Sequence, residues 1–170
     1  MQVSDNRRLG GMNRRMVNGV GALICGALLV FALYSEHILG LEPCPLCVFQ
    51  RVAVLALGFV FLAAYAHNPR PLGAKLYGVL VILAGGAGIV FAGRQLWLQS
   101  LPEEQVPECG PGLEFIMDVF PFWEAVTMVF RGSGDCAEVD WSLFGISMAG
   151  WVLMALVALV SLSTWNNFRR

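Results

Sequence analysis

Charged residues are scarce in this sequence. Asp, Glu, Lys and Arg together make up 14% of its 170 residues, and histidine occurs only twice. Hydrophobic residues make up 57%, and a soluble domain this apolar would have too little polar surface to cover itself. The chain also lacks a basic groove, a nucleotide-phosphate loop and any flavin or haem motif. These absences argue against a soluble domain and against a nucleic-acid partner.

Long apolar runs account for the hydrophobic excess. Each of four runs is close to the ~20 residues needed to cross a bilayer, and they occupy residues 16–34, 48–66, 76–98 and 145–165. The sequence therefore predicts an all-α membrane protein, a four-transmembrane-helix bundle made by a single integral membrane domain over residues 1–170. Arginines precede the first run, as in a cleavable signal peptide. That run is long, however, and no clear small-x-small site precedes Ser35, so we interpret it as a retained span.

The net charge of −1 conceals an uneven charge distribution. Basic residues lie near both termini and in the short middle connection, whereas nearly all acidic residues lie in two other loops, residues 35–47 and 99–144. Because Lys and Arg favour the cytoplasmic side, this pattern predicts cytoplasmic termini and two outward loops. In a bacterium these loops would face the periplasm, where disulfides persist. The basic residues near the termini and in the middle connection are Arg7, Arg8, Arg14, Arg15, Arg70, Lys75, Arg169 and Arg170.

The segments outside the spans differ in character. Residues 1–15 are polar and are expected to form a loosely ordered lead. In the second outer loop, residues 113–130 are apolar with scattered acids and are interrupted at Pro121. This stretch predicts one or two short amphipathic helices lying in the membrane interface. The stretches that flank it are rich in glycine and are expected to be mobile.

A C-x-x-C motif stands where the first outer loop meets the second span. Pro43 and Pro45 disfavour helix in the residues before them and are expected to delay the helix start to about residue 46 or 47. Cys47 would then lie in the first turn, where backbone N–H groups favour a thiolate over a thiol. Arg51, four residues on, would lie on the same face and add positive charge. With Cys44, the motif predicts a redox-active dithiol held at the membrane surface.

Two further cysteines, Cys109 and Cys136, lie in glycine-rich stretches of the second outer loop. Structural disulfides would staple the loops, but a C-x-x-C bridge closes almost no chain and is more typical of reactive thiols. A zinc site usually has two C-x-x-C halves, and only one is present. Thiol–disulfide exchange suits the pattern better. Mobile, exposed cysteines would meet a soluble partner, and the membrane-proximal pair would meet lipid quinone, because net oxidation requires an electron sink.

Several residues within the spans have a simple structural interpretation. Cys25 lies mid-membrane and is expected to be a buried, inert thiol. Arg94, near the outer end of the third span, either snorkels to the headgroups or has a functional role. Gln95 is equally open between helix packing and a pocket. Gly85 and Gly88 have the spacing of close helix–helix contacts.

Taken together, these features resemble the DsbB family of bacterial inner-membrane disulfide-generating proteins, over essentially the whole chain. The similarity rests on the spans, on Cys44-x-x-Cys47-x-x-x-Arg51 at the second span, on Gly93-Arg94-Gln95 closing the third, and on Cys109 and Gly-Asp-Cys136-Ala-Glu in the second outer loop. Each element alone is common in proteins, whereas the combination is highly specific.

The resemblance implies a direction of electron flow. Cys109 would react with a reduced periplasmic DsbA-like oxidase of the thioredoxin fold, and Cys136 would pass the electrons to Cys44. Cys47 would then reduce a bound ubiquinone or menaquinone, with Arg51 and Cys47 as the quinone-binding residues. No metal site is implied.

Two positions depart from the best-known members of that family. An acid described before the arginine is Gln50 here, and Gln99-Ser100 stands where some members carry a histidine. These residues are left out of the expected chemistry. One alternative is a vitamin K epoxide reductase-like protein, although there the C-x-x-C starts a late span and here it opens the second. The other alternative is a disulfide-stapled membrane scaffold without turnover.

Overall fold

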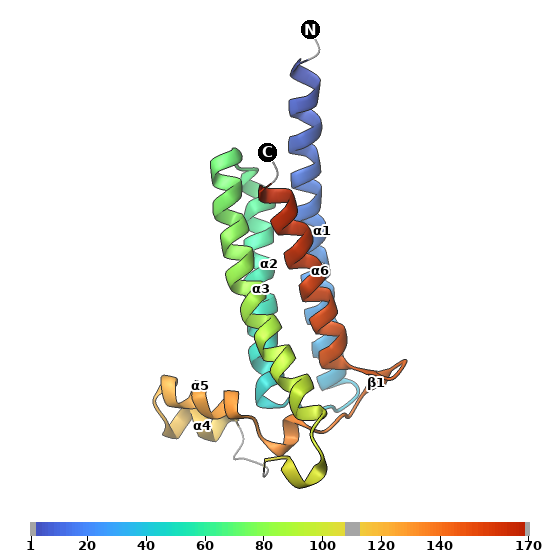
Figure 1. The fold of residues 1–170 in the computed structure, drawn as a ribbon, viewed down its shortest axis with the longest axis vertical. Coiled ribbons are helices and arrows are strands. Elements are labelled where there is room, and N and C mark those ends of the chain that lie inside the picture. Colours follow the sequence, from blue (N-terminus) through green and yellow to red (C-terminus); the bar gives the residue numbers. More distant parts are fainter. Residues whose placement is uncertain (1–2, 108–112, 169–170) are drawn as a thin grey trace.

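A computed structural model describes residues 3–107 and 113–168 of the chain. Four long helices form its body: α1 (Val3–His37), α2 (Pro45–His67), α3 (Pro71–Gln99) and α6 (Met148–Phe168). In the described part of the chain, these are the helices long and apolar enough to cross a membrane, α1 through its segment Arg14–His37. Figure 1 shows them side by side as one bundle. The prediction of an all-α, four-helix membrane protein is confirmed.

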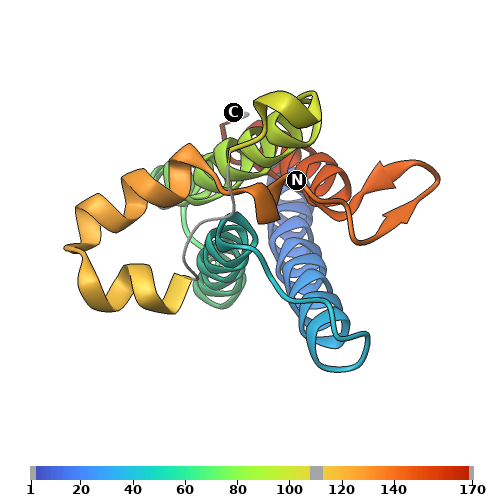
Figure 2. The same ribbon diagram turned by 90° about the horizontal axis from the view of Figure 1, so that it is seen from below.

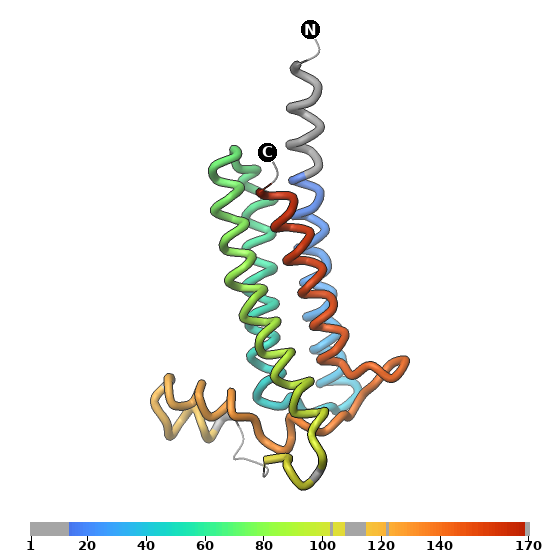
Figure 3. The backbone as a smooth tube through the Cα atoms, viewed as in Figure 1, coloured from blue at the N-terminus to red at the C-terminus, as the bar shows by residue number. Residues whose placement is uncertain are grey.

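The connections place the two outer loops at one end of the bundle, which we call the loop end. The α2–α3 turn and the C-terminal end of α6 lie at the opposite end (Figures 1 and 3). Helix α3 packs against both α2 and α6, and α1 packs chiefly against α2. The α2–α3 turn is tight because Asn68 ends α2 in the left-handed conformation and donates its N–H to the carbonyl of Ala64. The described residues that were expected to face outward are thereby gathered at one end.

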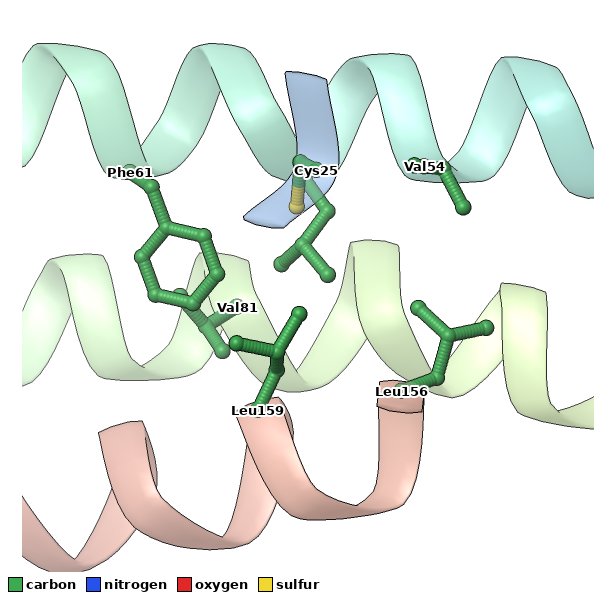
Figure 4. Packing of buried hydrophobic residues seen from close by; sticks show 7 residues of the cluster. Cys25, Val54, Phe61, Val81, Leu156 and Leu159 are labelled. Atoms are coloured by element: carbon green, nitrogen blue, oxygen red, sulfur yellow. The ribbon is translucent and has the colours of Figure 1, made fainter. Parts of the chain in front are cut away.

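The core between the helices is a continuous apolar cluster. Its most buried members, each exposing at most 1% of its surface, are Cys25, Leu57, Phe61, Val81 and Leu156. Figure 4 shows Cys25 of α1 among side chains from α2, α3 and α6. The buried position expected for Cys25 is confirmed, because its thiol fills space in this cluster as a small apolar side chain does.

Short elements occupy the loop end. The second outer loop contains η1 (Glu103–Gln105), α4 (Leu113–Val119), α5 (Phe122–Arg131) and η2 (Gly134–Cys136). Helices α4 and α5 are separated at Pro121, as the sequence predicted, and Figure 2 shows them projecting to one side of the bundle. Strands β1 (Ser142–Leu143) and β2 (Ile146–Ser147) form an antiparallel hairpin. Its turn residues Phe144 and Gly145 both have positive φ, as a tight hairpin turn requires.

Three sequence predictions about boundaries are wrong. Residues 3–15 continue helix α1 and do not form a loose lead. Helix α2 begins at Pro45, earlier than expected, because the fixed φ of proline suits the first helical position, where its missing N–H has no partner to lose. The last long helix begins at Met148 and not at Gly145, because the β1–β2 hairpin uses the residues before it. The long helices also extend past the predicted spans.

Candidate functional site

Cys44 and Cys47 meet at the first turn of α2. Cys44 is the N-cap: its backbone is extended and its Sγ accepts a hydrogen bond from the N–H of Cys47 at 3.3 Å. The two Sγ atoms lie 2.7 Å apart, and both residues are free thiols. An N-cap satisfies one of the unpaired N–H groups at a helix start, and a sulfur fills this role here. The pair is therefore positioned for a disulfide to open and close within it.

Cys136 approaches the same pair from the second outer loop. It ends η2, exposes 0% of its surface, and packs with Cys44, Leu98 and Val129 in one apolar cluster. Cys136 and Cys44 are therefore packed together, and the Cys44 thiol affects the ionisation of Cys136. The prediction that Cys136 is exposed is wrong, because Gly132, at φ +85°, lets the chain turn directly over Leu98. Cys136 thus joins Cys44 and Cys47 in one cluster, although it is far from them in the sequence.

The electrostatics of this cluster favour a thiolate at Cys136. A hydrogen bond from the Cys44 thiol lowers the pKa of Cys136 to about 6, with further help from the backbone of Leu46 and from Ser133. The same contact, with that to Cys47, raises the pKa of the Cys44 thiol. Cys136 therefore carries the negative charge while Cys44 keeps its proton. A thiolate is the attacking form in disulfide exchange, and here it lies beside a sulfur of the motif.

Two buried glutamine side chains adjoin the motif. Gln95 of α3 donates from Nε2 to the Sγ of Cys47 at 3.2 Å and to that of Cys44 at 3.5 Å. Its Oε1 accepts from Nε2 of Gln50 at 2.6 Å. Both glutamines are 5% exposed. Sequence reasoning left Gln95 undecided and Gln50 out of the chemistry. The sequence signal that could have identified them is an amide side chain inside an apolar run. Burying an amide in a membrane costs free energy unless it is hydrogen-bonded, so such an amide is expected to have a partner.

Arg51 lies one turn beyond Cys47, as predicted. Its guanidinium is half-buried and forms an ion pair with Glu36 of α1. Nη2 also donates to the carbonyl of Ala32 at 3.1 Å. Sequence reasoning assigned no partner to Glu36, since nothing in the chain order shows that these two helices approach there. Arg51 therefore connects α1 to the start of α2.

A cavity of about 100 Å³ opens beside these groups. Such a volume has room for several water-sized groups. Cys47 and Arg51 both line it, together with apolar side chains that include Leu29, Val54 and Val152. A mostly apolar pocket with a few polar groups is typical of small-molecule sites. These residues fit a quinone, because its ring is apolar and its carbonyl oxygens accept hydrogen bonds from a guanidinium.

The two remaining residues of interest differ in outcome. Cys109, predicted to meet a soluble partner, lies outside the described residues. Arg94, left open between snorkelling and a functional role, bonds through its guanidinium to the carbonyl oxygens of Phe130 and Arg131 at the end of α5. It contacts none of the cysteines through these bonds and holds the second outer loop against α3.

Comparisons with known proteins agree with this arrangement. The family model described as disulfide bond formation protein DsbB matches residues 14–166. The chain belongs to the DsbB family. A disulfide bond formation protein B of Marinobacter nauticus is 46% identical over 94% of this chain and 95% of its own length. The protein of the same name from Nitrosococcus oceani is 50% identical over 91% of this chain and 92% of its own length. That of Methylococcus capsulatus is 48% identical over 89% and 93%.

Family membership and the apolar helices together define a multi-pass membrane protein. The DsbB match over residues 14–166 covers most of α1 and α6, all of α2 and α3, and the connections between them. It therefore includes the cysteine cluster, the two buried glutamines and the Arg51–Glu36 pair within a single family domain.

Proposed function

We propose that this chain is a disulfide-generating membrane oxidoreductase that reoxidises a periplasmic DsbA-like thiol oxidase and passes the electrons to a membrane quinone. The observation that supports it most directly is the contact of Cys136 with Cys44 in one buried cluster, beside Cys47. That contact connects the loop that would meet a soluble protein with a dithiol at the edge of the bundle. Its other support is membership of the DsbB family.

The chain begins the proposed cycle with two disulfides, Cys109–Cys136 and Cys44–Cys47. A thiolate of the reduced partner attacks Cys109, a mixed disulfide forms, and Cys136 leaves as a thiolate. The second partner thiol then attacks the mixed disulfide, which releases the oxidised partner and leaves Cys109 reduced. Two electrons have thus entered the chain, and the partner has gained one disulfide.

Transfer to the second pair uses the sulfur contact described above. The thiolate of Cys136 attacks Cys44, a Cys136–Cys44 bond forms, and the Cys44–Cys47 bond breaks with its electron pair on Cys47. Cys109 then attacks Cys136, so that the Cys109–Cys136 disulfide returns and Cys44 is released. Cys136 leaves the first exchange as a thiolate, which is the attacking form, and its contacts with the backbone of Leu46 and with Ser133 favour that form by lowering its pKa.

The quinone, ubiquinone or menaquinone, accepts two electrons and two protons when bound. Cys47 and Arg51 would hold it in the cavity that both line. The guanidinium would donate to a carbonyl oxygen and favour negative charge there. Apolar side chains such as Leu29, Val54 and Val152 would lie against the quinone ring. Reoxidation restores the Cys44–Cys47 disulfide.

The location follows from the charge pattern. Arg14 and Arg15 lie in the N-terminal half of α1, and Arg70 and Lys75 lie at the start of α3. Figure 1 shows the α2–α3 turn and the N-terminal half of α1 away from the loop end. The preference of Lys and Arg for the cytoplasm supports a bacterial inner-membrane protein with both termini cytoplasmic and both cysteine loops periplasmic.

Turnover with purified components tests the proposed function. The full chain in detergent is mixed with a reduced DsbA-like protein and quinone, and the absorbance of the quinone is followed. We expect quinone reduction to match partner oxidation one to one, and to stop in Cys47→Ser and in Cys136→Ser. A wild-type protein that leaves the quinone oxidised, or turnover that survives either substitution, would overturn the proposal and favour a non-catalytic scaffold.

A further inference from the structure

We propose that Gln95 is a catalytic residue that donates a hydrogen bond to the sulfur anion formed at Cys47, and that Gln50 is a positioning residue that orients its amide. The inference rests on the proposed function, because it concerns the opening of the Cys44–Cys47 disulfide. Gln95 touches the reacting sulfurs directly, whereas Gln50 acts through Gln95.

The contacts of Gln95 with the two sulfurs show that its amide can hydrogen-bond the anion formed at Cys47. When the Cys44–Cys47 bond breaks, its electron pair stays on Cys47, and the Nε2 of Gln95 lies 3.2 Å from that atom. The Oε1 of the same amide lies 3.5 Å from it and accepts from the neutral thiol. One side chain thus has a hydrogen bond for both protonation states of Cys47. It also reaches Cys44, so it contacts both sulfurs of the disulfide.

The contact with Gln50 orients the amide of Gln95. An amide can present either its oxygen or its nitrogen to a neighbour. The Nε2 of Gln50 donates to the Oε1 of Gln95 at 2.6 Å, which holds the oxygen toward α2 and turns the Nε2 of Gln95 to the sulfurs. Both side chains are buried, and a buried donor left without an acceptor is costly. The orientation is therefore fixed before the anion forms.

Burial makes this donor matter more than it would in water. Hydrogen bonds to charged groups contribute more than those between neutral groups, and a low local dielectric strengthens them. A guanidinium one turn away is already paired with Glu36, so part of its charge is compensated. Among the described residues, the donors in contact with the Cys47 sulfur are the Cys44 thiol, at 2.7 Å, and the amide of Gln95, at 3.2 Å.

The test measures the thiols of the reduced, quinone-free protein. Iodoacetamide is added in short pulses at neutral pH, and modification of Cys47 is quantified by peptide mass spectrometry. The same peptides report the Cys44–Cys47 disulfide at equilibrium with glutathione. Gln95→Met keeps the length of the side chain and removes the donor. We expect alkylation of Cys47 to slow about tenfold and the glutathione equilibrium to shift about tenfold toward the disulfide, about 30 mV for this two-electron couple.

Further variants separate this role from packing. Gln95→Glu keeps the shape and adds a negative charge, so alkylation should be slower than in Gln95→Met. Gln50→Met should slow alkylation of Cys47 about threefold, because the amide of Gln95 can then rotate away from the sulfurs. This variant also tests the proposal if Gln95→Met folds poorly. Gln99→Leu is the matched control. It removes an amide one turn away that accepts from Ser147, and it should leave both measurements unchanged.

The outcomes are distinct from those of the proposed function. If wild-type protein reduces quinone but Gln95→Met has wild-type alkylation and a wild-type glutathione equilibrium, this inference is overturned and the proposed function stands. Altered unfolding without a change in the equilibrium would likewise assign Gln95 a purely structural role. If the wild type does not turn over, the proposed function fails whatever the variants show.

Discussion

Arg94 of α3 caps the C-terminal end of α5 through the carbonyl of Phe130, 36 residues further along the chain. Its Nε donates to that oxygen at 3.0 Å, and its Nη2 donates to the carbonyl of Arg131 at 2.9 Å. The last carbonyls of a helix have no partner within it and carry partial negative charge, so a guanidinium is a favourable cap. Helix α5 leads directly into η2, so this cap also positions the segment that carries Cys136.

Replacing Arg94 should loosen that segment. We expect Arg94→Met to increase cleavage by an added protease between α5 and η2 about tenfold, and to weaken the Cys136–Cys44 contact. Limited proteolysis and alkylation of Cys136 measure the two effects. Trp97→Leu is the control, because it removes the ring on which the guanidinium stacks and leaves both hydrogen bonds in place. Equal protection of Arg94→Met and wild type would contradict the role of the cap.

The main features of this molecule could be predicted from the sequence because they depend on local patterns in the chain. Apolar runs of membrane length predicted the helices, Pro121 predicted the break between α4 and α5, and the spacing of Cys47 and Arg51 predicted their common face. Each of these features depends on neighbours within a few positions. The helix ends were predicted less accurately. Proline disrupts the interior of a helix but is favoured at its first position, which Pro45 occupies.

The contacts that complete the candidate site could not be predicted in this way. Gln50 meets Gln95 across 45 residues, and Arg51 meets Glu36 from a different helix. These pairs depend on how each helix is rotated about its axis and how deep it lies in the bundle. The sequence does not determine either, because these helices have apolar side chains on all faces. Cys136 was expected to be exposed because glycines surround it, yet the same glycines let it pack over Leu98.

Arg51 should affect quinone binding more than disulfide exchange. We expect Arg51→Met to raise the KM for quinone about tenfold or more, because a hydrogen bond from a charged donor is lost. Exchange between Cys136 and Cys44, followed with glutathione, should continue. Glu36→Gln keeps the guanidinium and neutralises its partner, so a smaller change in KM is expected. A wild-type KM in Arg51→Met would remove Arg51 from the quinone site.

The ionisation of Cys136 should make the stability of the reduced protein depend on pH. Its pKa falls from the usual thiol value of 9.0 to about 6 on folding. A lowered folded-state pKa contributes stability that is complete above the unfolded pKa and is lost as the pH falls through the folded one. The melting temperature of reduced wild type, relative to Cys136→Ser, should therefore decline between pH 9 and pH 6. A constant difference across that window would show that the thiol is not ionised.

Close packing of α3 against α6 should make Gly85 sensitive to substitution. A Cβ at this position would overlap Cγ2 of Val160, whose β-branched side chain has little freedom to move away. We expect Gly85→Ala to lower the free energy of unfolding by about 1–3 kcal/mol, the usual cost of overpacking. Gly86→Ala is the matched control, since no described atom lies within 4 Å of its added Cβ. Denaturant titration in mild detergent, followed by helical circular dichroism, measures both, and equal losses would contradict this packing.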